Sequence, residues 1–406
     1  MMTKHRRGVM MLLCLSPLLS GLGCGSSLRP VLATELLGPV VQAPTPDSFS
    51  VIWSSVQAAA HAADETRFAL RVLDDEGGVV GAFPAECSDG RCLAEADGLA
   101  PGVRYRYEVV STVDGGEVTA ILAAGSARTS PPRGNPFEFL AFGDNGPGRE
   151  SQHALARVMA RFSPDLIVHT GDLIFADGAL EGYPDRFYEP YAPLLARAAF
   201  YMTLGNHDYA RDERAPVLDT LILPANGPPD QPAERNYWFD YGDVRFVCID
   251  SNAPSAQVAG SVVPWLEEVL AEAGARWKIV WFHRPIYTHA FHLPAGALRD
   301  AVAPVFDRYG VHLVLCGHNH LYERSYPIRA GKPVPEGEGT VYITTGASGQ
   351  HRYKARPFRP AYMAMQVDSQ FSFTVVDVGP DSLCLRQIGE RGEVLDEYRL
   401  VHAAGP

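Results

Sequence analysis

The chain has 406 residues, of which 46% are hydrophobic and 20% are charged, so it is long enough for two domains with substantial cores. Its 47 acidic residues outnumber its 35 lysines and arginines, which gives a formal net charge of −12 at pH 7. A general nucleic-acid-binding protein carries a basic face or stripe, so this balance argues against that class. The acidic balance does not exclude an anionic substrate, because bound metal ions can reverse the local charge of a site.

The first 24 residues are typical of an export signal. A basic start over residues 4–7 precedes an apolar stretch over residues 8–19, which is shorter than the roughly 20 residues needed to span a bilayer. Gly21-Leu22-Gly23-Cys24 then resembles a bacterial lipoprotein box, although such a box usually opens with Leu. We therefore predict a signal peptide over residues 1–24 and a lipid at Cys24, the alternative being simple cleavage nearby.

This signal predicts an exported protein, either periplasmic or held as a lipoprotein at the outer membrane or cell surface. The protein would meet the membrane only through the lipid at Cys24, because no later apolar run is long enough for a membrane helix. An exported chain can keep disulfides. Cys87 and Cys92 bracket a turn-like Ser-Asp-Gly-Arg insert and are placed to close a small loop. Cys248 and Cys316 lie inside apolar strand-like runs, which favours buried core thiols.

Residues 25–35 have the character of a short tether, and residues 36–128 have the pattern of an all-β domain. Short alternating runs, such as residues 49–53 and 68–72, are separated by turns rich in Gly, Asp and Pro. Residues 99–107 resemble the late turn and strand of a fibronectin type III-like sandwich. No chemistry is visible in this segment, so we interpret it as a structural spacer, the alternative being recognition of a substrate or surface.

Residues 129–136 contain three prolines and form a predicted linker, and from residue 137 to about 400 strand patterns alternate with helical ones. Because the strand runs are apolar on both faces, helices must cover their sheets, which predicts a four-layer α/β sandwich. Residues 341–400 add further strands that we expect to complete one sheet. The predicted strands are residues 137–141, 166–169, 200–204, 244–249, 278–282 and 311–316, and the predicted helices are residues 151–162, 263–273 and 297–309.

Five short polar clusters each follow the end of one of these strand runs. In open α/β sheets, ligands bind beyond the carboxyl ends of the strands, so we expect the clusters to converge on one site. Their Asp, Asn and His side chains are ligand types that suit two divalent first-row metal ions side by side. The clusters are Gly143-Asp144-Asn145-Gly146, Gly171-Asp172-Leu173-Ile174-Phe175, Gly205-Asn206-His207-Asp208, Val280-Trp281-Phe282-His283 and Gly317-His318-Asn319-His320.

The order and spacing of these clusters resemble those of the calcineurin-like metallophosphoesterases. Tyr322-Glu323-Arg324 directly after the last cluster, and Gly346-Ala347-Ser348-Gly349 after a strand run, resemble the purple acid phosphatase branch of that family. The resemblance covers nearly the whole mature chain. It implies an all-β sandwich followed by a metallophosphoesterase four-layer α/β sandwich over residues 137–400. We expect Tyr322-Glu323-Arg324 to be structural, with an ion pair that holds its loop.

The resemblance also implies a ligand for each position of a two-metal centre. Asp172 is expected to bridge two divalent ions of Fe, Mn or Zn, since a carboxylate offers one oxygen to each ion. The first ion would be bound by Asp144 and His320, and the second by Asn206, His283 and His318.

Two further histidines are expected on the substrate side. The resemblance implies that His207 contacts the phosphate and protonates the leaving alcohol, the alternative being a structural histidine bonded to a ligand carboxylate. His289 and His292 both follow the strand that ends at His283. We predict His292 as the second catalytic histidine, because its position fits the family better.

One cluster departs from the branch pattern. Residue 175 is Phe where purple acid phosphatases carry a metal-binding Tyr, and residue 146 is Gly where other metallophosphoesterases place a His. A ferric ion with a phenolate and a divalent ion without one leave about the same net charge. We therefore interpret Phe175 as the mark of a site built for two divalent ions, the alternative being a weakened first site in a degraded enzyme.

The function that follows is hydrolysis of phosphate monoesters, as in acid phosphatases, by a hydroxide that two metal ions activate for attack on phosphorus. The expected partner is a small phosphate-ester substrate and not a nucleic acid. Two alternatives stay open. The first is a phosphodiesterase on the same scaffold, because the motifs do not separate the two reactions. The second is a non-catalytic surface lipoprotein that binds metal ions or phosphate esters.

Overall fold

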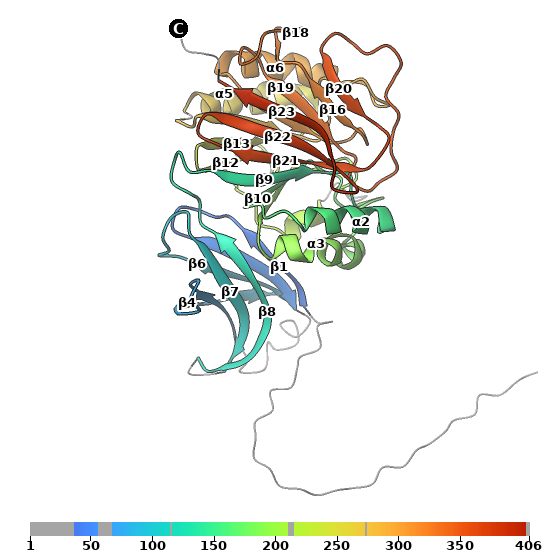
Figure 1. The fold of residues 1–406 in the computed structure, drawn as a ribbon. Coiled ribbons are helices and arrows are strands. Elements are labelled where there is room, and N and C mark those ends of the chain that lie inside the picture. Colours follow the sequence, from blue (N-terminus) through green and yellow to red (C-terminus); the bar gives the residue numbers. More distant parts are fainter. Residues whose placement is uncertain (1–35, 56–66, 114–115, 210–214, 273, 403–406) are drawn as a thin grey trace, which may run out of the picture. The chain divides into compact units, whose positions relative to one another are not determined.

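The structure is a computed structural model, and it describes residues 36–55, 67–113, 116–209, 215–272 and 274–402. The predicted export signal, Cys24 and the tether lie outside these residues. Within the described ranges, no helix combines the length and the apolar character needed to cross a membrane. Figure 1 shows a β-sandwich formed by the first strands and a larger domain of sheets and helices formed by the rest of the described chain.

The N-terminal domain consists of two antiparallel four-stranded sheets, in the strand orders β1-β2-β6-β5 and β4-β3-β7-β8. Alternation of side chains puts one face of each strand into the core: Phe68, Leu70 and Val72 of β3 are buried, as are Tyr107 on the adjacent β7 and Trp53 on β2 of the other sheet. The strands are β1 (Leu36–Gln42), β2 (Phe49–Ser55), β3 (Arg67–Leu73), β4 (Val79–Pro84), β5 (Glu86–Ser88), β6 (Arg91–Ala96), β7 (Arg104–Thr112) and β8 (Val118–Arg128).

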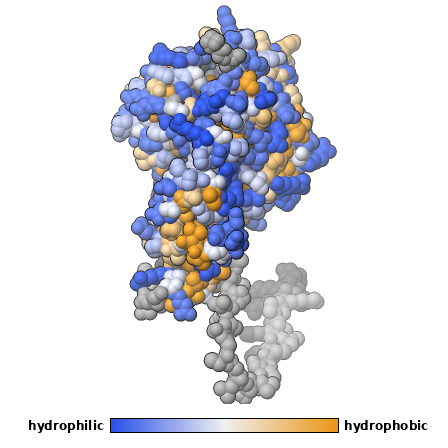
Figure 2. Space-filling model, turned by 60° about the vertical axis from the view of Figure 1, so that its left-hand side comes forward, coloured by the Kyte–Doolittle hydropathy of each residue, from blue (hydrophilic) through white to orange (hydrophobic). Residues whose placement is uncertain are grey.

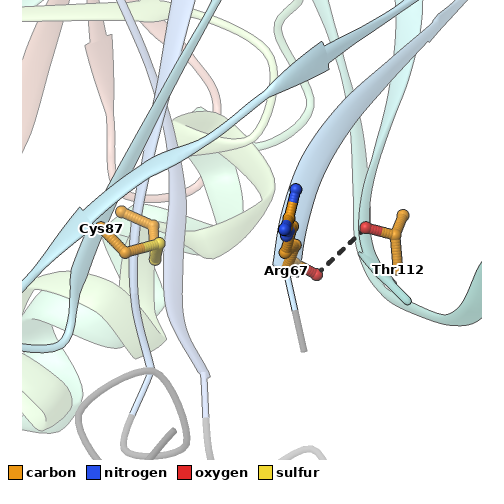
Figure 3. The surroundings of a disulfide bond; sticks show 4 residues. Arg67, Cys87 and Thr112 are labelled. Atoms are coloured by element: carbon orange, nitrogen blue, oxygen red, sulfur yellow. Dashed lines mark hydrogen bonds between the residues drawn. A yellow bond between two sulfur atoms is a disulfide. The ribbon is translucent and has the colours of Figure 1, made fainter. Parts of the chain in front are cut away.

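A disulfide closes the hairpin of β5 and β6. Cys87 and Cys92 lie opposite one another in the ladder and are bonded through their sulfur atoms, so the predicted loop closure is confirmed (Figure 3). The same view shows the Thr112 hydroxyl donating a hydrogen bond of 3.4 Å to the carbonyl of Arg67, which joins β7 to β3. Within each sheet, a side-chain bond thus reinforces the backbone ladder between two strands.

Residues 129–136 carry no helix or strand, and the larger domain begins directly after them with β9 (Phe137–Phe142). Its six-stranded sheet also contains β10 (Leu166–His169), β11 (Ala199–Met202), β21 (Ser372–Val378), β22 (Ser382–Gly389) and β23 (Val394–Val401), in the order β11-β10-β9-β21-β22-β23. Strands β9, β10 and β11 run parallel to one another, so their carboxyl ends meet at one edge.

A seven-stranded sheet packs against the first one. Phe139 of β9 meets Phe246 of β13 edge-on, with ring centroids 5.5 Å apart, so the main core lies between the two sheets. Strands β13, β14, β15 and β19 are parallel. The order is β12-β13-β14-β15-β19-β16-β20, with β12 (Tyr237–Tyr241), β13 (Val244–Cys248), β14 (Trp277–Trp281), β15 (Leu313–Cys316), β16 (Tyr322–Ser325), β19 (Val341–Thr345) and β20 (Met363–Val367).

Helices cover the outer faces of both sheets, which confirms the predicted four layers. Tyr191 of α3 (Glu189–Leu195) stacks on Phe142 of β9, and α2 (Glu150–Met159) packs beside α3. Helices α5 (Val263–Ala271) and α6 (Gly296–Tyr309) form a second core with the other face of the seven-stranded sheet. Shorter elements are η1 (Leu180–Gly182), η2 (Pro184–Tyr188), η3 (Pro216–Asp219), α4 (Ser255–Gln257), η4 (Val258–Val262), β17 (Ile328–Arg329) and β18 (Lys332–Pro333).

The expectation that residues 341–400 complete one sheet is wrong. Strands β19 and β20 join the seven-stranded sheet, whereas β21, β22 and β23 join the six-stranded one. An alternating or apolar pattern shows that a strand has a buried face, but it does not show which of two facing sheets the strand joins. Helix α3 was not predicted, because it is short and contains two prolines, Pro190 and Pro193.

A buried carboxylate joins the β-sandwich to the larger domain. Asp165 is 6% exposed and lies directly before β10. Its Oδ1 accepts a hydrogen bond from Arg104, and its Oδ2 lies 2.9 Å from Nη1 of Arg128. Gln42 adds a hydrogen bond of 2.9 Å to the carbonyl of Phe200 in β11. The sandwich is therefore fixed beside the strands whose carboxyl ends carry the first polar clusters.

Hydrophobic side chains also reach the surface. In the view of Figure 2 they gather on the β-sandwich, and the exposed large residues of that domain include Val79 and Ile121, which are 60% and 53% exposed. A second group lies on loops of the larger domain, where Phe291, Leu293 and Phe358 are 63%, 68% and 94% exposed. The loops that carry this second group also carry residues of the candidate site.

Candidate metal centre

The five polar clusters converge at the carboxyl ends of β9, β10, β11, β14 and β15. Backbone hydrogen bonds join one cluster to the next: the Asp144 N–H donates to the Gly171 carbonyl at 3.0 Å, and the Gly317 N–H donates to the His283 carbonyl at 3.0 Å. The predicted convergence of side chains that are far apart in the sequence is therefore present. All six predicted metal ligands lie in this region.

Four of the predicted ligands form one tight group around the imidazole of His283. Its Nε2 lies 3.2 Å from Oδ1 of Asn206, 3.1 Å from Nδ1 of His318 and 3.3 Å from Oδ2 of Asp172. Ligands bound at about 2.0–2.2 Å to one first-row metal ion are separated from one another by distances of this size. The predicted ligand set of the second ion, together with the predicted bridge, is thus arranged for a single ion.

The other two predicted ligands lie beside this group. Oδ1 of Asp144 is 3.4 Å from Nε2 of His320. Oδ2 of Asp144 accepts a hydrogen bond of 2.8 Å from the backbone N–H of His318, but Oδ1 is buried and has no hydrogen-bond partner in the described part of the chain. A buried oxygen without a partner is costly, and a cation would satisfy it. The residues therefore fit a metal ion at the first position as well.

Hydrogen bonds fix which ring nitrogen of two ligand histidines faces the site. Nδ1 of His283 lies 2.9 Å from the Thr170 carbonyl, and Nδ1 of His320 lies 2.6 Å from the His351 carbonyl. A carbonyl oxygen only accepts, so each Nδ1 carries a hydrogen and each Nε2 has its lone pair free for a metal ion. Burial and the neighbouring His283 lower the pKa of His318, so that ring is neutral and also able to bind metal.

The pKa values of the two carboxylates depend on each other's charge and on the neighbouring histidines. Burial raises the pKa of Asp144, the neighbouring His320 and His283 oppose this effect, and the charge of Asp172 adds to it. Burial alone would also raise the pKa of Asp172, but the adjacent His283 holds it below its ordinary value. Without metal ions, His283 therefore acts as the cation of the site, and Asp172 in turn raises the pKa of His283 to about 9.

The backbone is strained where ligands are presented. Asp144, Asp172 and His318 have φ angles of 56°, 56° and 67°, in the left-handed region that side chains other than glycine rarely adopt. Two glycines allow the clusters to approach closely. A Cβ at Gly205 would lie 2.0 Å from Oδ1 of Asp172, and one at Gly146 would lie 1.8 Å from the carbonyl oxygen of Leu173. Gly146 therefore leaves no room for a histidine ligand at that position.

His207 lies at the edge of the ligand group. Its backbone N–H donates to Oδ1 of Asp172 at 2.8 Å, and its Nδ1 donates to the carbonyl of Ala176 at 2.6 Å. Its ring packs on Phe175, with centroids 4.5 Å apart. Among the described residues, Nε2 of His207 has no hydrogen-bond partner, so this nitrogen is free to exchange a proton with a ligand.

His292 and His289 are placed differently. The ring of His292 stacks on the ligand His318, with centroids 4.1 Å apart, and its backbone N–H donates to Oδ1 of Asn319 at 2.9 Å. Nε2 of His289 instead donates to the carbonyl of Pro357 at 2.9 Å, on the adjoining loop. Of the two histidines, His292 is the one whose ring lies beside the ligand group, as predicted for the second substrate-side histidine. Its catalytic role stays a prediction.

Phe175 faces the first metal position. Its ring lies edge-on to the ring of His320, with centroids 5.9 Å apart, and it is 8% exposed. On the same histidine, Tyr353 stacks almost parallel, with centroids 4.2 Å apart and planes 8° apart. Sequence reasoning missed Tyr353, because the loop that carries it has neither a strand pattern nor a cluster motif. Together, the two aromatic rings restrict how the imidazole of His320 can turn.

Two buried residues inside the clusters were not assigned a role from the sequence. Asp208 accepts backbone hydrogen bonds from Asp172, Leu173 and Gly205 at 2.7–2.8 Å, and burial together with the charge of Asp172 raises its pKa to about 7. Asn319 donates to Thr288 and to the carbonyl of His292. Both residues hold loops in place, and their positions within two of the motifs were the available signal.

The segment after the last cluster is structural, as expected. Arg324 forms a two-pronged ion pair with Asp396 of β23, at 2.7 and 3.0 Å, and the Tyr322 hydroxyl donates to the same carboxylate at 2.8 Å. Glu323 is buried and accepts the backbone N–H of His289 at 2.9 Å. The segment therefore ties the last cluster to β23 and to the loop that carries His292.

The larger domain is similar to known phosphoesterases. Residues 137–322 match the family model described as calcineurin-like phosphoesterase. Tartrate-resistant acid phosphatase type 5 of the mouse (Mus musculus) is 24% identical over 325 residues, which cover 70% of this chain and 95% of the mouse protein. A barley (Hordeum vulgare) protein named nucleotide pyrophosphatase/phosphodiesterase is 25% identical over 268 residues, 58% of this chain and 72% of that protein.

Among solved structures, the purple acid phosphatase PPD1 from yellow lupin (Lupinus luteus) seeds has a TM-score of 0.78 at 18% identity, covering 91% of this chain and 74% of that chain. This likeness concerns the fold. The chain spans 57% of the length of several other curated relatives.

Residues 137–322 of the larger domain therefore match a calcineurin-like metallophosphoesterase domain, and relatives named as acid phosphatases indicate a metal-dependent hydrolase of phosphate esters. Within that class, its relatives and its N-terminal β-rich region mark it as similar to the purple acid phosphatases.

The ligand assignment predicts how metal content depends on two residues. Asp172→Ala should leave well under one tightly bound ion per chain, because it removes the donor shared by both positions. His283→Ala should leave about one, because it removes the centre of the second group only. Metal content after dialysis, measured by plasma emission spectrometry, checks both values. Asp300→Ala, at an exposed carboxylate of α6, is the control. Full metal content in Asp172→Ala would contradict the assignment.

Proposed function

We propose that this chain hydrolyses phosphate monoesters at a centre of two divalent metal ions, of Fe, Mn or Zn. The single observation that carries the proposal is the paired arrangement of donor atoms: three of them lie around Nε2 of His283, and an oxygen of Asp144 that is buried without a partner among the described residues lies beside His320. Two ligand groups next to one another, sharing Asp172, are the requirement for a two-metal site.

Bound there, the two ions would supply Lewis acidity, which lowers the pKa of water toward about 7 and offsets negative charge on the phosphoryl group. The chain's own residues supply the arrangement. Thr170 and the carbonyl of His351 hold the imidazoles of His283 and His320 with Nε2 toward the site. Asp208 fixes the loop of Asp172 through three backbone hydrogen bonds, so the ligands need little reorganisation.

His207 supplies the proton in this proposal. Because Nδ1 already donates to Ala176, the only nitrogen that can exchange a proton with a substrate is Nε2. Protonated at both nitrogens, the imidazolium would give the Nε2 proton to the oxygen of the departing alcohol and become neutral. A positioned acid of this kind contributes roughly 10²- to 10⁴-fold to a rate. His292, stacked on His318, would contact the phosphate from the same side as the second ligand group.

The proposal extends to where the protein works. The basic and apolar start of the chain and the box that ends at Cys24 support export and lipid attachment at that cysteine, with the membrane reached only through the lipid. The net charge of −12 does not support nucleic acid as the partner, and the proposed metal ions are what would attract a small phosphate ester.

The direct test is turnover by protein loaded with two equivalents of Mn²⁺, Zn²⁺ or Fe²⁺. We expect kcat/KM for 4-nitrophenyl phosphate to exceed that for bis(4-nitrophenyl) phosphate by at least about tenfold, the size of a 1.4 kcal/mol preference. A preference for the diester would replace the proposal with a phosphodiesterase. Two bound ions with no turnover of either ester would replace it with a non-catalytic binding protein.

His207→Ala is expected to keep both metal ions but to lower kcat, and to do so more for poor leaving groups than for good ones. An alkyl phosphate needs a proton on its leaving oxygen, whereas 4-nitrophenolate leaves with little help. Rates with a series of phosphate esters of rising leaving-group pKa measure this dependence. His289→Ala, whose ring is bonded to Pro357, is the control. An equal loss across the series would show that His207 only positions the phosphate.

Phe175→Tyr tests whether the site is built for two divalent ions. Because the Phe175 ring lies edge-on to His320, a hydroxyl added there has access to the first metal position. Loaded with iron and oxidised, the variant should develop a phenolate-to-iron absorption band that the wild type lacks, and it should hold ferric iron more firmly. Phe358→Tyr, at a side chain that is 94% exposed, is the control. A coloured wild type would show that another residue, with Tyr353 the nearest stacked phenol, supplies a phenolate.

A further inference from the structure

Arg284 directly follows the predicted ligand His283, and its side chain is held in place by the neighbouring loop after β13. Nε of Arg284 donates to Oδ1 of Asn252 at 3.0 Å. The amide of Asn252 is itself fixed, since its Nδ2 donates to the carbonyl of Leu204 at 2.9 Å. The backbone N–H of Arg284 donates to the hydroxyl of Ser251 at 2.9 Å. The guanidinium is therefore positioned by both its backbone and its Nε.

The rest of the guanidinium has no protein partner in the part of the chain that the structure describes. No described carboxylate lies within ion-pair distance of Arg284, and its two terminal nitrogens have no hydrogen-bond acceptor there. The side chain is half-buried. Arg324 and Arg245, which are also shielded from solvent, both pair with a carboxylate. A half-buried arginine with unused donors is suited to an anionic ligand.

Asn252 also places the guanidinium beside the candidate metal centre. Its Oδ1 accepts from Nε of Arg284, and its Nδ2 donates to the carbonyl of Leu204, two residues before the predicted ligand Asn206. Arg284 itself follows His283, whose Nε2 lies 3.2 Å from Oδ1 of Asn206. The guanidinium thus lies on the side of the second ligand group, close to where a phosphate held by that group would be.

We propose that Arg284 forms an anion subsite that binds an unsubstituted oxygen of the substrate phosphate and so selects monoesters over diesters. The inference rests on the proposed function and names a specificity-determining residue for it. A phosphate monoester has three unsubstituted oxygens that share two negative charges, whereas a diester has two that share one. Hydrogen bonds from a guanidinium to phosphate oxygens are charge-assisted, so the extra charged oxygen of a monoester gains more from this arginine.

Binding of inorganic phosphate to the metal-loaded protein tests the subsite without any turnover. In isothermal titration calorimetry, Arg284→Met should weaken phosphate binding by about 10- to 100-fold, the range expected for a lost hydrogen bond to a charged group. Arg284→Lys should recover part of the affinity, because the charge returns without the planar pair of donors. Arg299→Met, at an arginine of α6 that pairs with Asp300, should bind phosphate like the wild type.

The kinetic readout separates selection from general damage. Arg284→Met should raise KM for 4-nitrophenyl phosphate and lower the monoester-to-diester ratio of kcat/KM by about tenfold, with metal content unchanged. Unchanged phosphate affinity and an unchanged ratio in a metal-replete variant would overturn the proposal. If Arg284→Met loses metal ions or stability, Asn252→Ala takes its place: it frees Nε and should weaken phosphate binding by about 3- to 10-fold. Full affinity in that variant would overturn the proposal equally.

The two readouts also distinguish this subsite from the proposed function. If no ester is turned over but Arg284→Met still loses phosphate affinity, the subsite stands and the proposed hydrolysis fails. If turnover of the monoester is normal in Arg284→Met and phosphate affinity is retained, the hydrolysis stands and the subsite fails.

Discussion

The rest of this site depends on two carboxylates that are buried side by side. Asp144 and Asp172 are 0% and 1% exposed and follow adjacent parallel strands. Like charges that are close together and removed from water are strongly unfavourable unless cations accompany them. Without metal ions, His283 lies closest to Asp172, whereas Oδ1 of Asp144 is buried without a hydrogen-bond partner among the described residues. The fold thus stores an electrostatic cost that two divalent ions would relieve.

The strained backbone at the ligand positions follows from the need to hold the carboxylates in this arrangement. Both acids and His318 adopt left-handed backbone, which costs of order 1–3 kcal/mol per residue and persists where the surroundings enforce it. Here Asp208 enforces it for Asp172, by accepting three backbone N–H groups of the loops around it. Gly205 lets those loops close, since a methyl group there would occupy the space of the Asp172 carboxylate.

Much of this could be predicted from the sequence, because strand ends and polar clusters are local features. Because β9, β10 and β11 are parallel neighbours, Asp144, Asp172 and Asn206 come to one edge of the sheet, independently of how the connecting loops fold. Residues that reach the site through long loops could not be predicted in the same way. Tyr353 stacks on His320 from a loop without regular structure. Arg284 is positioned by Asn252, which lies in the loop after a neighbouring strand. Pairing of distant loops is a tertiary property that periodicity does not encode.

Phe175 connects the metal position to the proton donor. Its ring contacts His320, a predicted ligand of the first ion, and also His207, the predicted acid. A ferric ion paired with a divalent one, two carboxylates and a phenolate have the same formal charge as two divalent ions with two carboxylates alone. The loss of the phenol therefore need not change the attraction of the centre for a phosphate. The ring of Phe175 also gives His207 an aromatic surface to pack on, without a hydroxyl beside it. Phe175 is thus compatible with the proposed centre of two divalent ions.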